Sequence, residues 1–195
     1  MTSITAPRVL AAPLRGTWVR DAALVSGAAL FIAASAQVSI PLPFTPVPLT
    51  GQTLAVLLTG AALGSSLGLA STALYFALAL VGAPVLAPAA DGSHTAGSAV
   101  LSTPLLGYIV GFMAASFIVG RLAERGFTRT PLRTAVAMVA GNAAIYALGV
   151  AWLQHALGTG WSSAIALGMT PFLIGDAIKV AIAAGLLPTA WKFIR

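Results

Sequence analysis

The chain has 195 residues, of which 58% are hydrophobic and only 7% are charged, and its formal net charge at pH 7 is +6. Soluble domains carry roughly 25% charged residues, so this composition excludes an ordinary water-soluble protein. The basic residues are not interleaved with aromatic residues on a soluble face, so nucleic acid is not an expected partner. The chain contains no cysteine, which excludes disulfides, thiolate nucleophiles and thiolate metal sites.

The uncharged stretches predict an all-α integral membrane protein. No Asp, Glu, Lys or Arg occurs between Asp21 and Asp91 or between Arg133 and Asp176. We expect one domain, 1–195, in which a cytoplasmic tail of about residues 1–20 precedes six transmembrane helices in one bundle within the lipid bilayer. Each helix is near the ~20 residues that a ~30 Å hydrocarbon core requires, although the second and third are short. The predicted spans are approximately 21–40, 48–63, 66–83, 104–121, 133–154 and 171–190.

The connections between these spans differ in character. Residues 41–48 contain four prolines in eight positions, which predicts a stiff loop or cap rather than regular helix. The joint at 64–66 is so short that the spans on either side must form an antiparallel hairpin. The longest connection, 84–103, is rich in Pro, Ala, Ser and Gly, and we expect it to act as a lid. Residues 155–170 are predicted to form the last outer loop.

The basic residues predict the orientation. Nine of the ten fall on one side of the predicted spans, and the opposite loops carry none. By the positive-inside rule, both termini are cytoplasmic, so the chain is a multi-pass protein of the cytoplasmic membrane. Asp176 then lies close to the outer face, which favours uptake over export. The nine residues are Arg8, Arg15, Arg20, Arg121, Arg125, Arg129, Arg133, Lys192 and Arg195.

Small residues recur at four-residue spacing. Gly60, Gly64 and Gly68 form one such series, and Gly107 and Gly111 form another. This spacing allows helix backbones to approach closely, and packing within the bundle is the simplest interpretation.

The first predicted span presents a whole surface of small residues around Ala29 and Ala33. The spacing is consistent both with burial inside the bundle and with docking of another membrane subunit. The other small residues of this surface are Ala22, Ala23, Ser26 and Gly27.

Two charged residues lie three apart in the last predicted span, at Asp176 and Lys179. This spacing puts both on one helix face. A charge deep in hydrocarbon costs at least about 2.5 kcal/mol, so such residues are retained when they face the protein interior and have a function there. The pair neutralises itself and offers a polar solute both an acceptor and a cationic donor. We therefore predict a binding site on this span.

Uncharged polar residues within the other spans are further candidates for this site. Asn142 and Tyr146 are four residues apart and share a helix face. Hydrogen bonding between helices is an alternative role for any one of these residues. The set consists of Gln52, Thr53, Tyr75, Asn142 and Tyr146.

A serine hydrolase is an alternative to a binding protein, since Gly64-x-Ser66-x-Gly68 matches the pattern of a nucleophile elbow. Ser66, however, lies on a predicted cytoplasmic turn, whereas the elbow requires a strand-to-helix turn and a nearby base. Neither His94 nor His155 lies within a span, and two histidines alone make a poor metal site. We therefore expect no catalytic residue, no metal and no cofactor.

Two motifs, taken together, carry a family resemblance. They are PVPLTGQTLAVLLTGA at residues 46–61 and PFLIGDAIK at residues 171–179. With these motifs in their order and span context, the chain resembles the BioY family, the biotin-binding substrate subunits of energy-coupling-factor (ECF) vitamin transporters. The likeness runs over about residues 20–192. The chain departs from the family at residues 88–94, where members often carry an arginine in a glycine-rich loop.

The resemblance implies a protein that captures biotin for uptake and works with a transmembrane coupling protein and two ABC-type ATPases. The chain has no Gly-x-x-x-x-Gly-Lys motif, so energy must come from another subunit or from the solute gradient. A self-sufficient transporter of biotin or a related vitamin is the main alternative, and a packing subunit that binds no small molecule is another. Lys179 remains for charge balance or for the biotin carboxylate. The residues implied for biotin are Gln52, Tyr75, Asn142, Asp176 and Lys179, and those implied for partner docking are Ala29 and Ala33.

Overall fold

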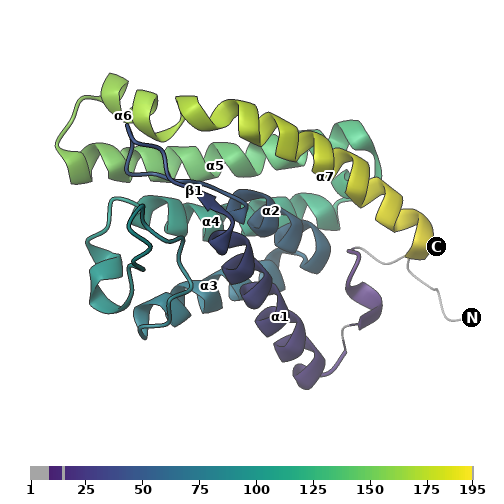
Figure 1. Cartoon of the computed structure of the whole chain (residues 1–195). Helices are drawn as coiled ribbons and strands as arrows, with labels where there is room; N and C mark the ends of the chain where they lie inside the picture. The colour runs from purple at the N-terminus through teal and green to yellow at the C-terminus, as the bar shows by residue number, and fades with distance from the viewer. Residues whose placement is uncertain (1–8, 15, 195) are drawn as a thin grey trace, which may run out of the picture.

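The computed structural model describes residues 9–14 and 16–194, and most of them are helical (Figure 1). Arg8, Arg15 and Arg195, which contribute to the predicted cytoplasmic charge, lie outside the described residues. The long helices are α1 (Trp18–Gln37), α2 (Gln52–Leu63), α3 (Ser65–Leu80), α4 (Leu106–Glu124), α5 (Pro131–Leu157) and α7 (Leu173–Ile194). The shorter elements are η1 (Ala12–Leu14), β1 (Ser39–Ile40), β2 (Leu49–Thr50), η2 (Gly97–Leu101), η3 (Phe127–Arg129), α6 (Trp161–Gly168) and η4 (Thr170–Phe172).

Helix α4 packs against α2, α3 and α5, while α7 runs along α5 and α1 crosses α2 and α3 (Figure 1). Glycine permits the close approaches. A Cβ atom on Gly60 would lie 2.4 Å from the carbonyl oxygen of Ser116, and one on Gly111 would lie 2.9 Å from the Cα of Ile145. The predicted packing role of these glycines is confirmed, because any larger residue would push α4 away from α2 or α5.

Four helical stretches of the described residues are long and apolar enough to cross a membrane: Trp18–Gln37, Leu106–Glu124, Pro131–Leu157 and Trp161–Phe193. Helices α2 and α3 are also apolar but have only 12 and 16 residues. At about 1.5 Å per residue they extend for about 18 and 24 Å, less than a full hydrocarbon core. The predicted second span begins at 48, four residues before α2 begins, and the predicted last span ends at 190, four residues before α7 ends.

The proline-rich segment is the connection of a short hairpin. Strand β1 pairs antiparallel with β2, so that Ser39 lies opposite Thr50 and Ile40 opposite Leu49. The Thr45 hydroxyl donates to the carbonyl oxygen of Leu167 at 2.8 Å, which ties the hairpin to α6. The chain is therefore non-helical from Val38 to Gly51, and α1 ends three residues before the predicted end of the first span.

The prediction of a plain loop over 155–170 is wrong. Helix α5 continues to Leu157 and ends at Gly158, whose φ of +62° is the left-handed conformation that glycine adopts without strain. Helix α6 then follows, with Ala164 and Gly168 buried against the bundle. The apolar residues of this segment form a helix because they have a protein surface to cover.

Candidate functional site

A cavity, called here the inner cavity, lies where α2, α4, α5 and α7 meet the loop after α3. About 70 Å³ of it is open to the centre of a water molecule, and one water needs about 10–15 Å³. Apolar side chains form most of the wall, including Val47, Leu86, Phe112, Ile145 and Phe172. The polar residues that line it are Thr50, Gln52, Thr53, Tyr108, Tyr146, Asp176 and Lys179.

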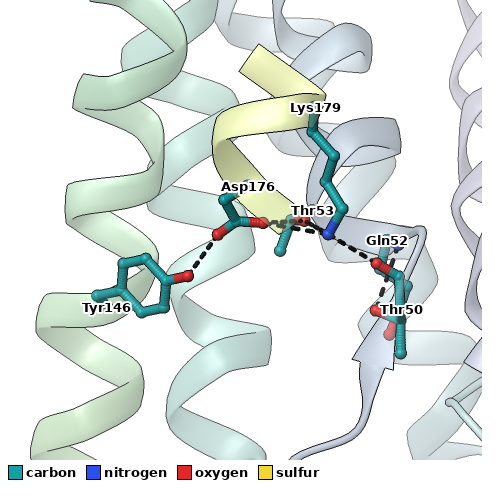
Figure 2. Close-up of polar contacts among 6 residues, drawn as sticks. All are labelled: Thr50, Gln52, Thr53, Tyr146, Asp176 and Lys179. Atoms are coloured by element: carbon teal, nitrogen blue, oxygen red, sulfur yellow. Dashed lines mark hydrogen bonds and ion pairs between the residues drawn. The ribbon is translucent and has the colours of Figure 1, made fainter. Parts of the chain in front are cut away.

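The predicted pair, Asp176 and Lys179, lies in this wall as an ion pair of 3.1 Å (Figure 2). The two side chains are only 7% and 16% exposed. Both lie in the first turns of α7, where the helix dipole favours a carboxylate. A buried pair is tolerated when further hydrogen bonds satisfy both groups.

The further hydrogen bonds come from the start of α2 and from β2. The Lys179 Nζ donates to the Thr50 carbonyl oxygen at 2.8 Å, to the Thr53 Oγ1 at 2.7 Å and to the Asp176 Oδ1 at 3.1 Å. These three bonds match the three protons of an ammonium group. The Thr53 hydroxyl also lies 3.3 Å from the Asp176 Oδ1, and the Tyr146 hydroxyl donates to the Asp176 Oδ2 (Figure 2).

Gln52 joins the inner cavity to the loop that follows α3. Its Nε2 donates to the Tyr75 hydroxyl, which in turn donates to the Val85 carbonyl oxygen at 3.2 Å. The next carbonyl, that of Leu86, accepts from the Nδ1 of His94 at 2.9 Å. Because Leu86 lines the inner cavity, these bonds fix one part of the predicted lid, 84–103, against the site.

Three of the five predicted ligand residues, Gln52, Asp176 and Lys179, line the inner cavity. Tyr75 does not line it, because its fully buried side chain lies behind Gln52. Asn142 is also buried, but it lines a separate groove between α5, α6 and α7.

Thr53 and Tyr146 line the inner cavity and were polar candidates from the sequence, but the resemblance did not include them among the five residues for biotin. Both were visible as polar residues inside apolar spans, and Tyr146 lies one turn from Asn142. Sequence spacing did not reveal which side of α5 faces Asp176.

The two alanines predicted for docking lie inside the bundle. Ala29 is 0% exposed and Ala33 is 8% exposed, on the face of α1 that also buries Ile32. This burial supports the packing interpretation that the spacing left open, because the chain's own helices cover both side chains. The same stripe continues at Ala22 and Ser26 toward the start of α1, where these two residues and the adjacent Ala23 and Gly27 are exposed.

Apolar helices around a hydrogen-bonded ion pair, which lies in the wall of a mostly apolar cavity, define a helical membrane protein with an internal site. Within that class, the chain belongs to the BioY family, whose model matches residues 5–195. It is 32% identical to the biotin transporter BioY of Rhizobium etli, over 80% of this chain and 84% of that protein. It is 37% identical to a probable biotin transporter BioY of Pyrococcus horikoshii, over 82% of this chain and 90% of that protein.

A solved structure has the same fold. It is the S-component for biotin from an ECF-type ABC transporter, which superposes with a TM-score of 0.78 at 22% identity. The match covers 91% of this chain and 95% of that chain. At this identity the likeness establishes the fold, and the site must be argued from the residues of this chain.

Proposed function

We propose that this chain binds biotin and acts as the substrate-binding S-component of an ATP-driven ECF transporter in the cytoplasmic membrane. The observation that carries the proposal is the Asp176–Lys179 pair beside the inner cavity, in a chain whose relatives are biotin transporters. The proposal involves no bond-making step and no cofactor.

The hydrogen-bonding groups at the cavity suit the ureido ring of biotin. This ring has two N–H donors and one carbonyl acceptor. The Asp176 carboxylate is an acceptor for one N–H group, with the strength of a charge-assisted bond. Gln52 uses its Nε2 on Tyr75, so its side-chain oxygen is the acceptor for the second. Lys179 balances Asp176 or receives the carboxylate of the ligand.

In the proposed arrangement α1, α2, α3, α4, α5 and α7 form one six-span domain with both ends cytoplasmic. The positive charge of the α4–α5 connection supports this orientation, with Arg121, Arg125, Arg129 and Arg133 on one side. The start of α1 and the end of α7 lie toward the same side of Figure 1. The inner cavity then opens from the outer half of the membrane, where a captured solute arrives.

The proposed partners are a transmembrane coupling protein and two ABC-type ATPases, which supply the energy that this chain has no motif to obtain. The accessible N-terminal half of α1, with Ala22, Ala23, Ser26 and Gly27, is the surface we assign to the coupling protein. Small residues there permit close helix approach.

Calorimetry of the purified chain with biotin, thiamine and riboflavin tests the binding step. We expect saturable binding of biotin alone. Absence of biotin binding by folded protein contradicts the proposal.

Uptake into liposomes then tests the energy source. We expect biotin accumulation to require the coupling module and ATP. Accumulation by the chain alone, driven by a proton or solute gradient, instead supports a self-sufficient transporter.

A further inference from the structure

A second hollow, called here the lateral groove, lies between α5, α6 and α7. It is much larger than the inner cavity, with about 720 Å³ open to water centres, and its walls are mostly apolar. Tyr146 and Asp176 line both spaces. The hydrogen bond from the Tyr146 hydroxyl to the Asp176 Oδ2 therefore forms part of the partition between them.

Both oxygens of Asp176 are occupied in the structure. Oδ1 is held by Lys179 and Thr53, and Lys179 is itself held by the Thr50 carbonyl oxygen. Among the described residues, Oδ2 accepts a single bond, from Tyr146. An incoming N–H donor displaces fewer bonds at Oδ2 than at Oδ1. Displacing Tyr146 from Oδ2 leaves the ion pair of Asp176 and Lys179 and its other hydrogen bonds in place.

Asn142 offers a second acceptor beside Tyr146. The Asn142 side chain is 8% exposed, and its buried Oδ1 has no hydrogen-bond partner among the described residues. Asn142 lines the lateral groove and lies one turn before Tyr146 on α5. Residues four apart on a helix are neighbours on one face. A buried acceptor without a hydrogen bond lowers the stability of the protein, so a new bond to the Asn142 Oδ1 is favourable.

We propose that the Tyr146 hydroxyl exchanges partners when the ligand binds. In the empty site it donates to the Asp176 Oδ2. When a ureido N–H takes that place, the Tyr146 ring moves toward the lateral groove, which has room for it, and donates to the Asn142 Oδ1. Tyr146 is thus a positioning residue: it holds Asp176 in the empty state and completes the hydrogen bonding of Asn142 in the bound state. This inference rests on the proposed binding of biotin.

Calorimetric titration of biotin into four proteins tests the exchange: the wild type, Tyr146→Phe, Asn142→Leu and the double variant. We expect Tyr146→Phe to bind biotin about fivefold more tightly. In this variant, no charge-assisted bond to Asp176 has to be exchanged for a weaker neutral bond to Asn142. Asn142→Leu binds about fivefold more weakly, because the displaced hydroxyl finds no acceptor. The double variant matches Tyr146→Phe, because Asn142 matters only through the Tyr146 hydroxyl.

Two further observations keep the test decisive. Nuclear magnetic resonance of tyrosine labelled with ¹³C at Cζ follows the Tyr146 signal, identified by its loss in Tyr146→Phe, and biotin should shift it. This measurement and Tyr146→Phe decide the question if Asn142→Leu does not fold. Weaker binding by Tyr146→Phe, or an additive double variant, overturns the exchange while leaving biotin binding by the wild type in place. If the wild type itself does not bind biotin, the proposed function fails first.

Discussion

Asp176 and Glu124 are two carboxylates with similar local chemistry and different surroundings. Each has a basic residue three positions away, Lys179 at 3.1 Å and Arg121 at 3.2 Å, and each accepts from a hydroxyl group. Asp176 lies in the wall of the inner cavity. The Glu124 Oε1 instead accepts from the backbone N and the Oγ of Ser65, both at 2.8 Å, at the first residue of α3.

The comparison teaches that a cavity beside one carboxylate leaves one of its hydrogen bonds replaceable, which the proposed binding role of Asp176 requires. Glu124 accepts from the N–H of Ser65, which has no partner within α3, and so stabilises the start of that helix as an N-cap does. Its partner Arg121 is 55% exposed, so the ion pair adds little. Asp176 is held by side chains, and one of them, Tyr146, borders open space on both sides.

The largest expected effect separates the two carboxylates by ligand affinity. Asp176→Asn leaves Lys179 uncompensated and removes the charged acceptor, so biotin affinity should fall by at least about 2 kcal/mol, or about thirtyfold. The matched variant Glu124→Gln should change it less than about twofold, because Glu124 does not line the inner cavity. Calorimetry on both folded variants makes the measurement. Wild-type affinity in Asp176→Asn removes this residue from the site.

The second prediction reverses the comparison and concerns stability. Glu124→Ala leaves the Ser65 N–H and hydroxyl without their acceptor, which should cost about 1–2 kcal/mol, in the range of a lost N-cap. The thermal unfolding midpoint in detergent should drop while biotin affinity at a lower temperature is retained. If the midpoint is unchanged, water replaces the carboxylate and Glu124 is not a structural cap.

Thr53 sharpens the comparison within the site. Thr53→Val removes the hydroxyl that bridges Lys179 and Asp176, and one lost hydrogen bond of about 1 kcal/mol predicts about fivefold weaker biotin binding. Thr53→Ser should restore most of the affinity.

The control for Thr53 is Thr72→Val, which removes a buried hydroxyl bonded to Ser116 away from the inner cavity. This control should lower stability without changing affinity. Equal losses of affinity in the Val variants at 53 and 72 would mean that Thr53 acts on the fold rather than on the ion pair.

The part of the site that sequence could predict is the part fixed by local geometry. Asp176 and Lys179 share a face because helical spacing dictates it, and apolar neighbours made their charges conspicuous. The proline content of 41–48 predicted an interruption for similar reasons. Two-residue strands such as β1 and β2 have too little periodicity to be recognised, so the position at which α2 begins was missed.

Tertiary packing decided the rest. Asn142 and Tyr146 share a face of α5, yet only Tyr146 reaches Asp176. Ala29 and Ala33 have the spacing of a docking surface, but spacing alone does not say which face of α1 meets α3. Helix α6 resembled a loop in sequence because it is short and bounded by glycines.

Asp91 extends the comparison to a third carboxylate, with the smallest expected effect. Its Oδ1 accepts from the backbone N of Ser93 at 2.9 Å and from the Ser93 Oγ at 2.7 Å, as Glu124 accepts from Ser65, but Asp91 is exposed in the loop after α3. The Ser93 hydroxyl and N–H hold the pKa of Asp91 below its ordinary value. A lowered folded-state pKa means that the turn gains stability above the unfolded pKa and loses it as pH falls through the folded one.

Hydrogen exchange at 91–93, corrected for intrinsic rates, should therefore be constant from pH 7 to 5 and faster in more acidic buffer. Asp91→Asn should remove that acid dependence and leave biotin affinity unchanged. A loss of affinity in Asp91→Asn would instead make this loop carboxylate part of ligand capture, and it would then belong with Asp176 rather than with Glu124.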